Sequence, residues 1–232
     1  MLMVAPILGA KPIPAQVKIG LAAILAILIA PLQPAEGPLL TDHLTIMLQV
    51  GREVLVGLLT GFSASLVFSA VQMAAQLMGV QVGYSFSNTL DPLSAQNTGF
   101  LDTFYNMLAI VIFMGLGGHH ALISGLVNSF QLAPLGTFGL PVESGNKLVL
   151  LISTTFSIAV RLAMPVVGTM FITDAAMALV VRSIPQMNVF SVGLPVKMVL
   201  GILVMIAFLP IMVAGISDIT RAAATAGVGI LR

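Results

Sequence analysis

Residues 42–80 read DHLTIMLQVGREVLVGLLTGFSASLVFSAVQMAAQLMGV, and this stretch decides the fold class. Thr41 or Asp42 offers an N-cap, and the apolar character continues to about Val80, which predicts one helix of roughly 58 Å. The hydrocarbon core of a bilayer is only about 30 Å thick. A helix over this whole stretch must therefore tilt, break or protrude from a membrane.

The composition places the chain in or on a membrane, or inside a lipid-shielded assembly. Hydrophobic residues make up 58% of the 232 residues, charged residues make up 7%, and the mean hydropathy is +1.10. Soluble domains carry about 25% charged residues, so this chain has too few to cover a water-soluble globule. A net charge of +1 without a basic cluster argues against nucleic acid, and the lack of cysteine excludes disulfides and thiolate metal sites.

The apolar stretches do not divide into clean spans of about 20 residues. Five provisional spans lie near residues 19–35, 54–80, 103–127, 148–178 and 198–217. The lysines and arginines between them divide evenly between the two sides, so the positive-inside rule sets no orientation. Two interpretations stay open: the number of spans differs, or the helices are not laid out as simple bilayer crossings.

Small residues recur every four positions within the first long stretch. Because positions four apart share one face of a helix, they predict a helix-packing seam against this chain or a partner subunit. Small residues are common in membrane helices, so a chance pattern is the alternative. The residues of the predicted seam are Gly57, Gly61, Ser65 and Ser69.

A polar segment at residues 79–102, GVQVGYSFSNTLDPLSAQNTGFLD, interrupts the hydrophobicity. It contains Asp91 followed by Pro92 and has no lysine or arginine. Irregular backbone exposed to lipid leaves amides and carbonyls unpaired, at several kcal/mol each, so the segment must lie in water, in protein or along a cavity. Physics alone favours an ordinary aqueous loop.

Residues 103–115 and 121–130 are predicted as apolar helices on either side of Gly117, Gly118, His119 and His120. Adjacent histidines on a helix point about 100° apart and chelate one ion poorly, so we interpret them as helix-end or interfacial groups. The sequence predicts no metal and no cofactor.

Two ionisable residues, Arg161 and Asp174, lie in the apolar stretch 148–181 and are expected to be buried polar groups. In one straight helix they would stand about 20 Å apart along the axis. A turn or kink near Met164 and Pro165 would let them pair; pairing with other subunits is equally open.

A second proline-rich motif, IPQMNVFSVGLPVK at residues 184–197, is expected to be a re-entrant or inter-helix connector, and Pro210 is expected to interrupt the segment after it. The residues that mark the connector are Pro185, Gln186, Asn188, Phe190, Pro195 and Lys197.

Four separated motifs carry a family resemblance. They are VAPILGAKPIPAQVKIGLA (4–22), GVQVGYSFSNTLDPLS (79–94), GGHHALISGLVNSF (117–130) and PQMNVFSVGLPVK (185–197). With these motifs, in this order, the chain resembles the FliR family of flagellar export-gate proteins, whose injectisome relatives are SctT-type proteins. The sequence of residues 192–195, VGLP, resembles flagellar members more than injectisome members.

The resemblance implies an all-α, membrane-associated fold of long kinked helices and helical hairpins that packs into a multi-subunit helical assembly. Family members combine with FliP and FliQ into a right-handed cone that one FliR closes, mostly above the bilayer plane in the flagellar basal body at the bacterial inner membrane. Unfolded flagellar proteins pass through its channel, driven by proton-motive force with FlhA and FlhB. The resemblance implies no enzymatic activity.

The resemblance also implies that the segment matching residues 84–100 is a plug that helps to close the channel. A neutral, Ser/Asn/Gly-rich loop can yield to an unfolded polypeptide without binding it tightly. The plug residues carried over to this chain are Gly83, Tyr84, Ser85, Phe86, Ser87, Asn88, Asp91 and Pro92.

The resemblance covers residues 1–232 as a single domain, expected to lack the family's first helix and to end short at Arg232. A small-solute transporter, with Arg161 and Asp174 at its site, is the rival from another class. Such transporters usually have two matching halves, and this sequence has no convincing internal repeat.

Overall fold

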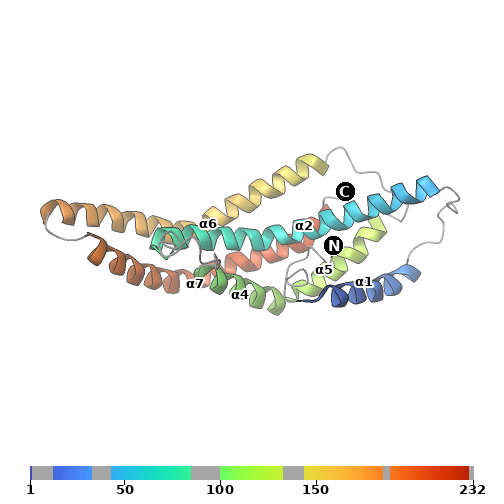
Figure 1. The fold of residues 1–232 in the computed structure, drawn as a ribbon, viewed down its shortest axis with the longest axis horizontal. Helices are drawn as coiled ribbons and strands as arrows, with labels where there is room; N and C mark the ends of the chain where they lie inside the picture. The colour runs from blue at the N-terminus through green and yellow to red at the C-terminus, as the bar shows by residue number, and fades with distance from the viewer. Residues whose placement is uncertain (2–12, 33–42, 85–99, 133–143, 185–188, 230–232) are drawn as a thin grey trace. The chain divides into compact units, whose positions relative to one another are not determined.

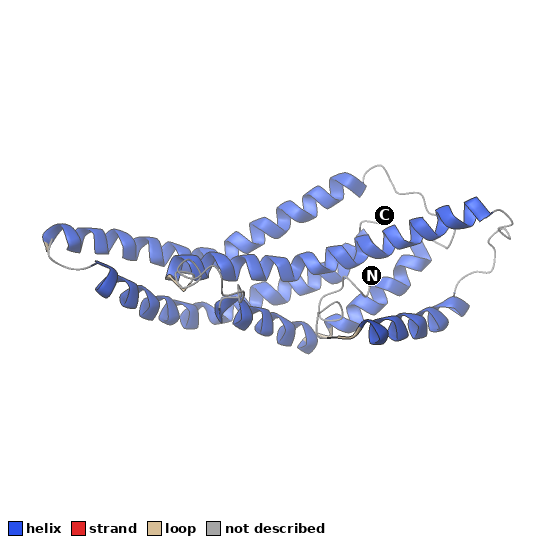
Figure 2. Ribbon diagram, viewed as in Figure 1, coloured by secondary structure: helices blue, strands red, loops and turns tan. Residues whose placement is uncertain are grey.

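The computed structural model describes residues 1, 13–32, 43–84, 100–132, 144–184 and 189–229. Over these residues the regular elements are all helices, as Figures 1 and 2 show. The predicted all-α class is therefore confirmed. In chain order the elements are α1 (Ala15–Ile29), the 3-10 turn η1 (Ala30–Leu32), α2 (His43–Val82), α4 (Phe100–Gly115), α5 (Gly118–Leu132), α6 (Ser144–Ser183) and α7 (Val189–Gly229).

The three longest helices are far longer than a bilayer span. Helices α2 and α6 have 40 residues each and α7 has 41, so each measures about 60 Å at the usual rise. The long helix predicted over residues 42–80 is confirmed; its predicted N-cap, Thr41 or Asp42, lies outside the described residues.

Among the described residues, three helices are apolar and long enough to cross a membrane: His43–Val82, Gly145–Ser183 and Ser191–Asp218. The pair Leu101–Gly115 and Gly118–Phe130, bent by 66°, makes a fourth if it counts as one span. The provisional span at 19–35 corresponds to α1, a shorter apolar helix. The chain therefore has the elements of a membrane protein.

Three prolines lie inside long helices without ending them, including Pro210, which was expected to interrupt its segment. Helix α6 continues through Pro165, and α7 continues through Pro195 and Pro210. A proline inside a helix costs about 3 kcal/mol. Ending the helix in apolar surroundings would instead leave several carbonyls unpaired, at several kcal/mol each, so continuing is the cheaper solution.

The contacts divide the chain into two compact units. The first unit consists of Met1–Phe68, Phe113–Ser153 and Ile219–Arg232. Its core includes the edge-to-face pair Phe68 and Phe113, whose ring centroids lie 5.3 Å apart. The Phe113 ring also covers Gly118, where a Cβ would lie 2.5 Å from it. Helix α2 adds the buried residues Val56, Thr60, Ser63 and Ala64.

The second unit consists of Ser69–Ile112 and Thr154–Asp218. In it, α6 and α7 form an antiparallel hairpin, in which Leu162 lies against Gly215 and Asp174 lies against Lys197 (Figure 1). The buried positions are dominated by alanine, methionine and valine, and small side chains let helices approach closely. They include Ala70, Ala74, Met78, Ala159, Ala163, Val166, Met170 and Met205.

Serine and threonine hydroxyls in both units donate to carbonyls of their own helix. Thr60 donates to Val56 at 3.0 Å and Ser63 to Thr60 at 2.9 Å, and the same bonding recurs along α5, α6 and α7. These bonds provide for polar groups that a membrane or an apolar neighbour could not satisfy.

Candidate functional site

The polar segment begins at a helix end set by glycine. Gly83 has a φ of +94°, and its N–H bonds to the carbonyls of Gly79 and Val80, each at 3.2 Å. A residue in this left-handed region closes a helix, and glycine adopts it without steric cost. Helix α2 thus runs further into the segment than the sequence indicated, up to Val82.

Of the predicted plug residues, only Gly83 and Tyr84 belong to the described part of the chain. The other six lie outside it: Ser85, Phe86, Ser87, Asn88, Asp91 and Pro92.

Helix α7 packs closely against this end of α2. A Cβ at Gly83 would lie 3.1 Å from Leu194 Cδ1, and a Cβ at Gly201 would lie 2.5 and 2.7 Å from the two γ-carbons of Val82. These distances are too short for a side chain at Gly201. The polar segment and the proline-rich motif, far apart in the sequence, therefore meet at the contact between Gly83 and Leu194.

An apolar cavity of about 200 Å³ lies between the two ends of the polar segment and α7. Tyr84 comes just before the undescribed residues, and Leu101 just after them; both line the cavity. Tyr105, at the same site, is 1% exposed, and its hydroxyl has no hydrogen-bond partner in the described part of the chain. The remaining lining residues are Phe104, Ile202, Met205, Ile206 and Leu209.

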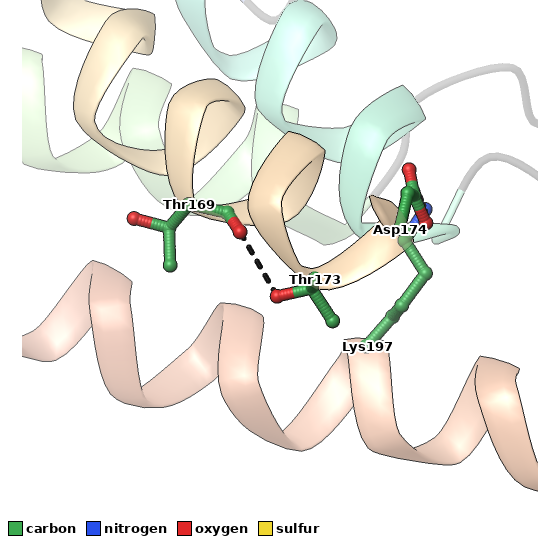
Figure 3. A network of polar contacts seen from close by, with 4 residues as sticks. All are labelled: Thr169, Thr173, Asp174 and Lys197. Carbon is green, nitrogen blue, oxygen red and sulfur yellow. Dashed lines mark hydrogen bonds and ion pairs between the residues drawn. The ribbon is translucent and has the colours of Figure 1, made fainter. Parts of the chain in front are cut away.

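One ion pair joins α6 to α7 in this unit. Lys197 Nζ lies 2.8 Å from Asp174 Oδ1 and donates a hydrogen bond to Oδ2 at 3.0 Å. Figure 3 shows Lys197 reaching from α7 to Asp174. The hydroxyl of the preceding residue, Thr173, points the other way and donates to the Thr169 carbonyl at 2.9 Å. The Lys197 side chain is 21% exposed and that of Asp174 is 46% exposed.

On this chain Arg161 and Asp174 do not pair with each other, and their burial by other subunits stays a prediction. No turn forms at Pro165, so α6 keeps Arg161 and Asp174 apart and Asp174 pairs with Lys197 instead. Both Arg161 and Asp174 are exposed on this chain, so the chain itself does not bury them.

The proline-rich motif is a connector over only part of its predicted length. Pro185, Gln186 and Asn188 lie outside the described residues. From Val189 onward the motif is helical, so Phe190, Pro195 and Lys197 belong to α7. The connector prediction is therefore wrong for these three, because α7 tolerates Pro195 near its start.

The predicted seam is only partly buried. Gly61 is buried, Gly57 and Ser65 are half-buried, and Ser69 is exposed. The more deeply buried small residues, Ala70 with Ala74 and Ala159 with Ala163, were missed. Their spacing of four was the available signal, and alanine is so common in apolar helices that the spacing did not stand out.

The two histidines occupy the first turn of α5, as expected for helix-end groups. Their ring centroids lie 4.3 Å apart. Within the described ranges no group of three histidine, cysteine or acidic residues forms a metal-binding cluster.

Comparison with known proteins decides the family. Residues 1–223 match the family described as bacterial export proteins, family 1. The chain belongs to this family. Its match to bacterial export proteins runs through both compact units, and the single-domain assignment stays a prediction.

The names of homologous proteins agree with this family assignment. The chain is 34% identical to flagellar biosynthetic protein FliR of Escherichia coli over 209 residues, which are 89% of this chain and 79% of that protein. It is 31% identical to FliR of Bacillus subtilis, over 87% of this chain and 78% of that protein. FliR of Caulobacter vibrioides is 30% identical over 87% of this chain and 81% of its own length. The resemblance to the FliR family is therefore confirmed.

Proposed function

We propose that this bacterial export protein is a membrane component of the flagellar protein-export apparatus. The observation that carries the proposal is the match over residues 1–223 together with relatives named FliR that align with most of the chain. The long apolar helices support a membrane location, and the relatives named for flagellar biosynthesis favour the bacterial inner membrane at the flagellar basal body.

In this proposal the chain assembles with FliP-like and FliQ-like subunits into the channel that unfolded flagellar proteins cross. The support is the poor coverage of its apolar helices. Of the most apolar window in each helix, only 17% is buried in α6 and 17% in α7, against 47% in α2. Apolar surface on this scale is covered by lipid or by other subunits, and neighbouring subunits also account for helices longer than the bilayer.

The segment that begins at Gly83 is proposed to help close the channel. Its support is its neutral, polar composition and its firm attachment: the end of α2 is fixed by the left-handed Gly83 and by contact with Leu194. A closure element needs such a rigid base if the remainder is to move aside for cargo. FlhA-like and FlhB-like components are the further proposed partners, and the proposed role is transport without catalysis.

Deletion of residues 85–98 from the complete complex tests the proposal. The complex is produced with its FliP-like and FliQ-like subunits, its composition is checked by co-purification, and ion leak is measured in cells or proteoliposomes. We expect the subunits to co-purify as before and the leak to rise, because the channel loses its closure element.

A variant with Gly51→Ala serves as the control, because a Cβ there meets nothing within 4 Å. Its leak should match that of the parent. An intact complex without added leak would remove the closure role, whereas failure of the parent chain to co-purify with these subunits would remove the channel assignment.

A further inference from the structure

One helical turn of α7 contacts two other helices. Leu194 lies against Gly83 at the end of α2, and Lys197 pairs with Asp174 of α6. Residues three apart lie on neighbouring positions of the same helical face, so both contacts act on the same turn. A second contact to α2 follows at Gly201, which lies against Val82.

The ion pair is a polar contact that holds this turn to α6. Around it, α6 presents apolar side chains, with Phe171 71% exposed and Ile172 69% exposed. In the proposed assembly these apolar side chains are covered, and the half-exposed carboxylate beside them then loses water, so removal of Lys197 leaves its charge without compensation.

Asp174 has no equally good substitute for Lys197 in its own helix. Arg161 lies about 20 Å away along α6, and Arg182 in the last turn lies about 12 Å away along the same axis. The bidentate contact, at 2.8 and 3.0 Å, therefore selects one register between α6 and α7.

We propose that Lys197 and Asp174 are positioning residues for the base of the channel closure, since their ion pair holds the turn that carries Leu194 against Gly83. The expected effect of this ion pair on channel closure rests on the proposed function. Its structural part, the docking of the α2 end on α7, can be measured separately.

A disulfide between α2 and α7 reports this docking. The chain has no native cysteine, and a Cβ at Gly201 lies 3.2 Å from the Val82 Cβ, close to the roughly 3.5–4.5 Å that a disulfide requires. The probe is Val82→Cys with Gly201→Cys in the assembled complex, and the readout is the rate of cross-linking under mild oxidation.

Asp174→Ala or Lys197→Ala should slow cross-linking about tenfold, equivalent to about 1.4 kcal/mol of lost docking. The exchanged pair, Asp174→Lys with Lys197→Asp, should restore most of the rate, because it returns opposite charges to the same two positions. Arg182→Ala removes an exposed cation from α6, the helix that carries Asp174. This variant should leave the rate of cross-linking unchanged.

In complexes without the cysteine pair, the two single variants should also raise ion leak, and the exchanged pair should lower it again. Cross-linking at the parent rate in both single variants, or failure of the exchanged pair to restore it, would overturn the positioning role. If deletion of residues 85–98 causes no leak, the proposed closure fails, and the cross-linking result still decides the docking independently.

Discussion

At the scale of single residues, the glycines of the long helices have unequal roles that the sequence does not distinguish. A side chain at Gly201 would collide with Val82, whereas a side chain at Gly168 would meet nothing within 4 Å. Both occupy apolar stretches of long helices. Only the packing of α7 on the end of α2 makes substitution of one of them, Gly201, costly while Val82 is present.

Gly201→Ala should destabilise the assembled complex by about 1–3 kcal/mol, the usual cost of overpacking. Valine has two γ-carbons and a stiff χ1, so Val82 cannot easily move away. The measurement is the thermal unfolding of the purified complex.

The matched control is Gly168→Ala, which should leave stability unchanged or raise it by up to about 1 kcal/mol, since alanine is the better helix former. Val82→Ala should partly rescue Gly201→Ala by removing both γ-carbons. Equal effects of the two glycine substitutions would contradict the contact.

The ion pair shows how much of the site the sequence could predict. Asp174 and Lys197 were both recognised as unusual, but in different motifs and with other expected roles. Pairing them requires the register between α6 and α7, which follows from where the intervening turn lies. The sequence placed that turn over residues 184–197, too far along the chain.

At the scale of elements, the apolar stretches and the glycines predicted the helices well, whereas proline misled. Helix α2 and the break at Gly117 lie where the sequence indicates. Pro165 and Pro210 were expected to end or turn helices, as they would in water. In α6, Pro165 has no N–H to donate to the carbonyl of Arg161, and the helix nevertheless continues through it.

The break between α4 and α5 provides a prediction about an element. Gly117 has a φ of +71°, and the two helices bend by 66° there. Gly117→Ala should cost about 1–2 kcal/mol for backbone reasons alone, since a Cβ there meets no other atom within 4 Å. Gly117→Asn should cost less, because asparagine tolerates this conformation.

Gly115→Ala is the control, since Gly115 also has open space around its Cβ and its φ is not positive. The readouts are the thermal stability of the purified complex and the swarming of cells that carry each variant. If Gly117→Ala were as harmless as Gly115→Ala, the left-handed conformation at the bend would be refuted.

At the scale of the whole molecule, most of the apolar surface of α6 and α7 remains uncovered by the chain itself. Composition alone predicted this class, because 7% charged residues cannot cover a soluble globule. What composition could not predict is which neighbours provide the cover, since lipid and protein both accept apolar side chains.

The chain purified alone should therefore be aggregated or heterogeneous in detergent, whereas co-expression with FliP-like and FliQ-like subunits should give a single stable species. Size-exclusion chromatography with light scattering provides the comparison. A well-behaved monomer that moves a small solute across liposomes would instead support a transporter.

The inward bonding of serine and threonine hydroxyls has a consequence for assembly. Each hydroxyl has a single proton to give, and in exposed or half-buried residues such as Ser65, Ser153 and Ser217 that proton already goes to the same helix. A neighbouring subunit that docks on these helices must then fit them chiefly by the complementary shape of the two surfaces. Surfaces matched by shape can slide by small steps without breaking directional bonds, a property that fits the proposed channel, which would have to widen and narrow around its cargo.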